Sequence, residues 1–163
     1  MSSIDMRFAS DSIVSGDPLD GWTAASRAHP SARVHGIDLL HASRPRAVRA
    51  LVHQRMTLLQ LALLRDREVR RALVVARLDD SCDLDRACAG FAAAAASIHR
   101  RFELQRGRPL GITVLVAPRS APTRDVQLRV AEGAPIVPDG PAAVTWTQAR
   151  EWGIRAAVNL QTL

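Results

Sequence analysis

The sequence ALVVARL at residues 72–78 is followed by DDS at 79–81, a long alanine-rich run, and GITVLVA at 111–117. Each apolar run has the length of a buried strand and is bounded by polar or turn-forming residues. The apolar residues between the two runs recur at alternating steps of four and three, which places them in one stripe along a helix: Leu84, Cys88, Phe91, Ala95, Ile98 and Phe102. This order predicts a strand, a helix and a second strand, as in an α/β domain.

The predicted central helix has signals at both of its ends. Asp80 or Ser81 can accept a hydrogen bond from the first turn, and Gly107 followed by Pro109 ends the helix, which predicts helix over residues 82–106. Glycine in a helix interior costs about 1 kcal/mol relative to alanine. Because small residues allow close approach, we expect another backbone to lie against Gly90.

The composition is typical of one domain with an aliphatic core. Of the 163 residues 47% are hydrophobic, yet no run of about 18 uncharged apolar residues occurs. The N-terminus does not have a basic region followed by an apolar one. Cys82 and Cys88 face different sides of one helix and cannot pair with each other. We therefore expect a cytoplasmic protein that makes no membrane contact.

Charge is spread unevenly along the chain. All 22 basic residues are arginine, which is typical of the coding bias of a GC-rich bacterium. Residues 44–78 carry nine arginines against two acids, and residues 100–129 carry seven arginines against two acids. These blocks predict a basic surface if the fold brings them side by side.

We divide the chain into an N-terminal extension, residues 1–33, and a single α/β domain, residues 34–163. Asp17 followed by Pro18 resembles a helix start, which predicts a short helix in the extension that buries Leu19 and Trp22.

The domain begins with a predicted strand over residues 34–41, followed by a helix that starts at Arg46. Arg55 interrupts the apolar face of this helix, so its side chain must reach solvent or find a carboxylate. No glycine or proline marks where the helix ends. An unbroken helix to residue 78 would be unusually long, which favours a break in the charged segment 65–71.

After the central unit, Val126, Leu128 and Val130 alternate with polar residues, which predicts a strand over residues 125–131. The connection of residues 118–124 is short and favours an antiparallel hairpin with this strand at the edge of the sheet. Residues 133–141 are a predicted loop. A last helix is predicted with Thr145 and Gln148 at its start, and it would bury the following residues: Ala149, Trp152, Gly153 or Ala156, and Leu160.

The fold class is therefore a small two-layer or three-layer α/β domain with the order strand, helix, strand, helix, strand, strand, helix. The alternative is a mostly helical chain with a β-hairpin. The order resembles the thioredoxin architecture. At the junction where that fold has a Cys-x-Pro-Cys motif, this chain has Ser43, Arg44, Pro45 and Arg46. The resemblance therefore implies a fold without dithiol redox chemistry.

Candidate chemical groups each have a simpler structural explanation. Cys82 lies at a helix start, where a thiol can become reactive, but no histidine is near it in sequence. His35 and His41 on one strand lie too far apart to share a metal ion. The cluster Asp79, Asp80, Asp83 and Asp85 can cap a helix or bind a metal. Phosphate-binding glycine loops and hydrolase motifs do not occur, so we predict no cofactor.

These observations favour a non-catalytic accessory protein that binds a protein partner. We predict that the partner contacts an arginine-rich helix face or adds a strand to the edge formed by residues 125–131. The predicted partner-binding residues are Arg46, Arg49, His53, Arg67, Arg70 and Arg129. One alternative is a nucleic-acid-binding protein that uses the same arginines. Another is a small enzyme with a metal site at Asp79 and Asp80.

Overall fold

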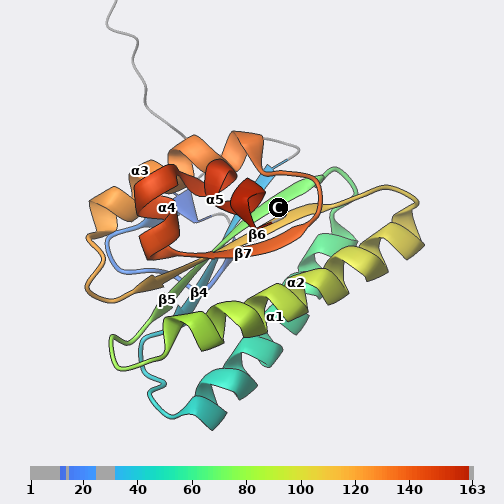
Figure 1. Ribbon diagram of the computed structural model, residues 1–163. Helices are drawn as coiled ribbons and strands as arrows, with labels where there is room; N and C mark the ends of the chain where they lie inside the picture. Colours follow the sequence, from blue (N-terminus) through green and yellow to red (C-terminus); the bar gives the residue numbers. More distant parts are fainter. Residues whose placement is uncertain (1–11, 14, 25–31, 162–163) are drawn as a thin grey trace, which may run out of the picture.

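The computed structural model describes residues 12–13, 15–24 and 32–161, and its core is one parallel sheet covered by helices on both faces (Figure 1). The elements follow in the order β1 (Ser12–Ile13), β2 (Ser15–Gly16), β3 (Thr23–Ala24), β4 (Ala32–Leu39), α1 (Pro45–Arg65), β5 (Arg71–Leu78), α2 (Leu84–Arg106), β6 (Gly111–Pro118), α3 (Thr123–Gly133), the 3₁₀ turn η1 (Ala134–Ile136), β7 (Pro141–Thr145), α4 (Trp146–Trp152) and α5 (Ile154–Leu160).

The main sheet has five strands in the order β2-β4-β5-β6-β7, and every neighbouring pair is parallel. Val34 of β4 lies opposite Leu73 of β5, which lies opposite Thr113 of β6. β5 and β6 are buried along almost their whole length, as is usual for parallel strands with both faces covered. The predicted α/β fold class is therefore confirmed, and the mostly helical alternative is wrong.

The two faces of the sheet carry separate apolar cores. Helices α1 and α2 cover one face, where Phe91 and Phe102 of α2 are fully buried. Helices α3, α4 and α5 cover the other face, where Val126 and Trp146 are buried. The helix after β6 lies on the opposite face of the sheet from α1 and α2, yet β7 is added on the same side as each strand before it, next to β6. The β6–α3–β7 crossover therefore has the opposite hand to the two crossovers before it.

The central unit forms where the sequence predicts it. β5 and β6 match the two apolar runs, and α2 matches the stripe between them. The cap of α2 is Asp83, whose carboxylate accepts a hydrogen bond from the backbone N–H of Arg86 at 3.1 Å, rather than Asp80 or Ser81. Gly107 ends the helix with a left-handed φ of 65°.

Two further predictions about α1 are confirmed. The helix ends at Arg65, so the charged segment does separate it from β5. Arg55 finds a carboxylate, because its Nε atom lies 2.9 Å from an oxygen of Asp17. The same carboxylate accepts a hydrogen bond from the backbone N–H of Asp38 at 3.0 Å, and so ties residue 17 to both α1 and β4.

The prediction of a strand over residues 125–131 is wrong, because this segment is helix α3. Val126 and Val130 are four residues apart, so an alternating pattern also places them on one face of a helix, and both are fully buried. Leu128, between them, is exposed. No hairpin follows β6, and the predicted edge for strand addition does not exist.

The last connection of the sheet leads to β7, which begins at Pro141, the final residue of the predicted loop 133–141, and continues to Thr145. This strand is parallel to β6. The antiparallel hairpin on which the resemblance to thioredoxin depends is therefore replaced by a helical crossover, and the resemblance is not supported.

Two predicted helices also differ from the structure. Residues 17–22 form a turn, followed by β3, instead of the start of a helix; residues 25–31 lie outside the described part. Leu19 is nevertheless buried, and β2 pairs with β4, so this part of the predicted extension joins the domain. The last helix begins with the predicted Thr145–Gln148 capping box but breaks at Gly153, which leaves Trp152 and Leu160 exposed.

Candidate functional site

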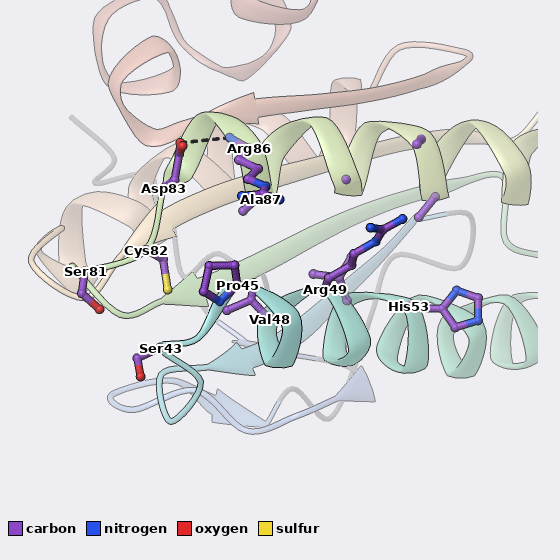
Figure 2. Close-up of a pocket in the computed structure, with 14 residues that line it drawn as sticks. Ser43, Pro45, Val48, Arg49, His53, Ser81, Cys82, Asp83, Arg86 and Ala87 are labelled. Carbon is purple, nitrogen blue, oxygen red and sulfur yellow. Dashed lines mark hydrogen bonds between the residues drawn. The ribbon is translucent and has the colours of Figure 1, made fainter.

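Helices α1 and α2 lie side by side on one face of the sheet and enclose a groove on their outer side (Figures 1 and 2). The two helices begin beyond the carboxyl ends of β4 and β5, so their first halves form the groove walls. The groove has a volume of about 560 Å³. Its lining consists of Ser43, Pro45, Val48, Arg49, Val52, His53, Ser81, Cys82, Asp83, Arg86, Ala87, Gly90, Ala93 and Ala94.

The floor of the groove is apolar and open. Val48 and Val52 come from α1, whereas α2 contributes residues without bulky side chains, among them Gly90 and Ala93. A Cβ atom built on Gly90 would meet no atom within 4 Å. The expectation that another backbone lies against Gly90 is therefore wrong. The small residues leave a hollow instead of allowing a close contact.

The rims of the groove carry positive charge. Arg49 reaches from α1 toward α2, and Arg86 lies on the facing helix (Figure 2). Neither guanidinium, nor the ring of His53, forms an ion pair or side-chain hydrogen bond with any residue in the described ranges. Asp83 is the acid of the lining, and its carboxylate is used to cap α2. The groove therefore presents unpaired cations beside an apolar floor.

Arg46 lies on the exposed first turn of α1, three residues before Arg49 and hence on the same side of the helix. This turn contains no acidic residue. The three predicted residues Arg46, Arg49 and His53 are thus brought together along one rim.

The other predicted partner-binding residues lie elsewhere. Arg67 and Arg70 belong to the connection after the far end of α1. Arg129 lies on α3, across the sheet from the groove, where its guanidinium pairs with Glu132 at 2.8 Å and donates to the carbonyl oxygen of Arg150 at 2.9 Å. The six residues therefore occupy three separate places, and Arg129 has a structural role.

Cys82 lies at one end of the groove, with its Sγ atom 3.4 Å from the carbonyl oxygen of Ala42. Burial and the nearby charge of Asp79 raise the pKa of the Cys82 thiol. Proximity to a helix start therefore does not produce a reactive thiolate. Cys88 is a core residue, and burial raises its pKa to about 11. Both cysteines are free thiols.

The acidic residues after β5 are engaged in loop contacts. Asp79 accepts hydrogen bonds from the backbone N–H and the hydroxyl of Ser81, at 3.0 and 2.7 Å, and these bonds lower its pKa. Asp80 accepts a hydrogen bond from the backbone N–H of Ser120 at 2.9 Å. Among the residues that the structure describes, no three metal-ligating side chains come together. The geometry thus lends no support to the Asp79 and Asp80 metal site.

Sequence reasoning missed the α2 side of the groove. Arg86, Gly90 and Ala93 follow one another at steps of four and three, on the side of the helix away from Phe91. A second stripe, made of small residues and one arginine, was the available signal. This stripe forms a groove wall only because α1 lies opposite it, and the sequence does not specify the position of α1.

Comparisons with known proteins do not identify this chain: no protein-family model matches it, and neither a curated protein nor a solved structure matches it. Within the described ranges, no helix has the length and apolar character needed to cross a membrane.

Proposed function

We propose that this protein is a non-catalytic accessory protein that binds an acidic, amphipathic α-helix of a protein partner in the groove between α1 and α2. The observation that carries the proposal is the combination of an apolar floor with unpaired cations on both rims. A helix that docks in a groove buries its apolar face and leaves its flanking side chains at the rims.

The apolar part of the groove supplies area for burial. Val48, Val52 and Ala87 line it, and the hollow at Gly90 gives room for a large apolar side chain of the partner. A volume of about 560 Å³ lies within the usual range for sites that bury a ligand. Burial of apolar surface contributes roughly 25 cal/mol per Å² removed from water. This contribution favours binding but does not fix the orientation of the docked helix.

The charged part supplies specificity. Arg46, Arg49 and His53 on one rim and Arg86 on the other favour glutamate or aspartate at both flanks of the docked helix. Arginine pairs with carboxylates through two parallel hydrogen bonds, so these pairs also orient the helix. A basic helix would be repelled by the same residues.

The test uses two designed helical peptides of about 15 residues that share an apolar face. One has glutamate at the flanking positions, and the other has lysine there. Titration into the labelled protein, followed by NMR, should shift amide signals around Val52 and Gly90 with the acidic peptide only.

The double variant Arg46→Glu and Arg49→Glu should abolish this binding. Because glutamate in the first turn complements the helix dipole, Arg46→Glu is not expected to weaken α1. The matched control, Arg67→Glu with Arg70→Glu, removes the same charge away from the groove and should bind the peptide normally. Equal binding of both peptides, or acidic-peptide binding that survives the groove variant, would exclude this assignment.

A further inference from the structure

A second basic surface lies at the far ends of α1 and α2, where the chain enters β5 and β6. We call it the edge cluster and define it as residues 65–71 and 100–108. These two segments contain eight arginines against three acids, an excess of five, whereas the whole chain carries a net charge of +6. Most of the net charge of the protein is therefore concentrated in sixteen residues.

Contacts of the two segments with each other and with the residues next to them hold them together. The guanidinium of Arg106 donates to the carbonyl oxygen of Leu64, and that of Arg108 donates to the carbonyl oxygen of Arg67. The backbone N–H of Gly111 donates to the carbonyl oxygen of Arg70 at 2.9 Å. The two arginine blocks of the sequence thus lie side by side, which is the condition under which they predict a basic surface.

Part of this charge has a structural purpose. Arg106 and Arg108 bridge the two segments, and Arg71 donates to the carbonyl oxygen of Pro135 at 2.7 Å. Arginines also stabilise the carboxyl ends of helices. The side chains of five arginines in the edge cluster form no ion pair or hydrogen bond with a described residue, and all five are exposed: Arg65, Arg67, Arg70, Arg100 and Arg101.

The acids of the edge cluster do not neutralise these five arginines. Asp66 is already paired with Arg33 at 2.7 Å. Glu103 lies 3.8 Å from the ring of His99. Glu68 is exposed and forms no ion pair with a described residue. The surface therefore offers several guanidinium groups to an anionic partner.

We infer that the edge cluster binds the phosphate backbone of a nucleic acid without reading its sequence. Planar guanidinium groups match phosphate oxygens in a bidentate way. Phe102, the aromatic residue of the cluster, is buried beneath Arg106, whose Cζ atom lies 5.6 Å from the ring centre, so it offers no face for a base. Leu104 is the exposed large apolar residue here, which leaves little area for a protein partner to bury.

The inference is independent of the helix-binding groove, because the two surfaces share no residue. It is tested with the full-length protein and two fluorescent probes, a duplex DNA of about 20 base pairs and a single-stranded RNA of the same length, by anisotropy between about 50 and 200 mM salt. For duplex DNA we expect the logarithm of affinity to fall with the logarithm of salt with a slope of about −3 to −4.5.

Two pairs of substitutions test the site: Arg67→Gln with Arg70→Gln, and Arg100→Gln with Arg101→Gln. Each pair should weaken binding at least about tenfold at low salt and reduce the slope by about 2. The control pair, Arg46→Gln with Arg49→Gln, removes the same net charge from the groove and should weaken binding less than about threefold. Thermal unfolding of each variant verifies that the fold is intact.

Three outcomes would overturn the inference. One is the absence of salt-sensitive binding to either nucleic acid. Another is an equal loss in the control pair, which would show that only net charge matters. The third is stronger binding to phosphatidylserine vesicles than to both nucleic acids, which would assign the edge cluster to a lipid surface.

Discussion

The groove and the edge cluster are both rich in arginine, yet they differ in what lies between the arginines. In the groove, Arg49 and Arg86 stand on either side of an apolar floor that includes Val52 and Gly90. In the edge cluster, the exposed arginines lie on two segments that the side chains of Arg106 and Arg108 hold together. The first arrangement favours a ligand with an apolar face, and the second favours one with charge alone. The class of ligand that an arginine binds therefore depends more on the residues around it than on the arginine itself.

Lowering the pH should have the largest effect, because it destabilises the folded sheet on which both surfaces depend. Burial and the charge of Arg33 lower the pKa of His35 from 6.5 to about 4. The imidazole of His35 therefore binds a proton at a higher pH in the unfolded state than in the folded state. Stability is fully present above pH 6.5 and falls as the pH drops from 6.5 toward 4, by at most about 3 kcal/mol.

Urea unfolding at pH of about 7, 5.5 and 4.5 measures this loss, with His35→Gln as the comparison that cannot titrate. The wild-type chain should lose more stability than the variant over this range. Parallel pH dependences of the two proteins would contradict the buried, neutral state of His35.

Salt should separate the two surfaces. Between about 50 and 200 mM salt, nucleic-acid binding by the edge cluster should weaken about a hundredfold, because each phosphate contact releases counterions. Binding of the acidic peptide to the groove should weaken less than about tenfold, because part of its free energy comes from apolar burial, which salt does not screen. Both affinities are measured by anisotropy on one preparation. Equal salt dependences would break the distinction between the surfaces.

Filling the floor should affect only the groove. A tryptophan at Gly90 would occupy the hollow, where an added Cβ meets no atom within 4 Å. We expect Gly90→Trp to weaken acidic-peptide binding about thirtyfold, or about 2 kcal/mol, and to leave nucleic-acid binding unchanged. Calorimetry with the peptide and anisotropy with the duplex give the two results. A loss of both activities would indicate that the substitution disturbs α2.

The smallest effect is expected for Gly90→Ala. Alanine is a better helix former and finds free space here, so the free energy of unfolding should rise by up to about 1 kcal/mol. The methyl group is too small to fill the groove, and peptide affinity should change less than about threefold. Chemical denaturation measures the first quantity. A destabilised variant would mean that a neighbouring group does lie close to Gly90.

Strong local signals made parts of the fold predictable. β5, α2 and β6 have long apolar runs or stripes with capping residues at their ends, and α1 has proline in its first turn. Arg55 was predicted to reach solvent or to find a carboxylate, because a charge on an apolar stripe is costly to bury, and its partner Asp17 was not foreseen.

Other parts were predicted incorrectly where short segments permit two structures. Val126 and Val130 fit one face of a strand or one face of a helix equally well, and only the core under α3 distinguishes them. β7 is five residues long and contains a proline and two alanines, which are weak strand formers. Trp152 was expected to be buried, but it is exposed at the end of α4, where the helix breaks at Gly153.

The candidate site was predictable on one wall only. Arg49 and His53 follow from the polar face of α1, whereas the opposite wall of Arg86 and Gly90 does not, because a groove is a property of two surfaces. The sequence by itself determined the strand–helix–strand centre, the start of α1 and the uneven charge, since these depend on neighbouring residues. Only the tertiary structure decided which arginines lie beside the apolar floor of the groove and which lie together in the edge cluster. The contacts that hold the edge cluster together join segments about forty residues apart in the sequence.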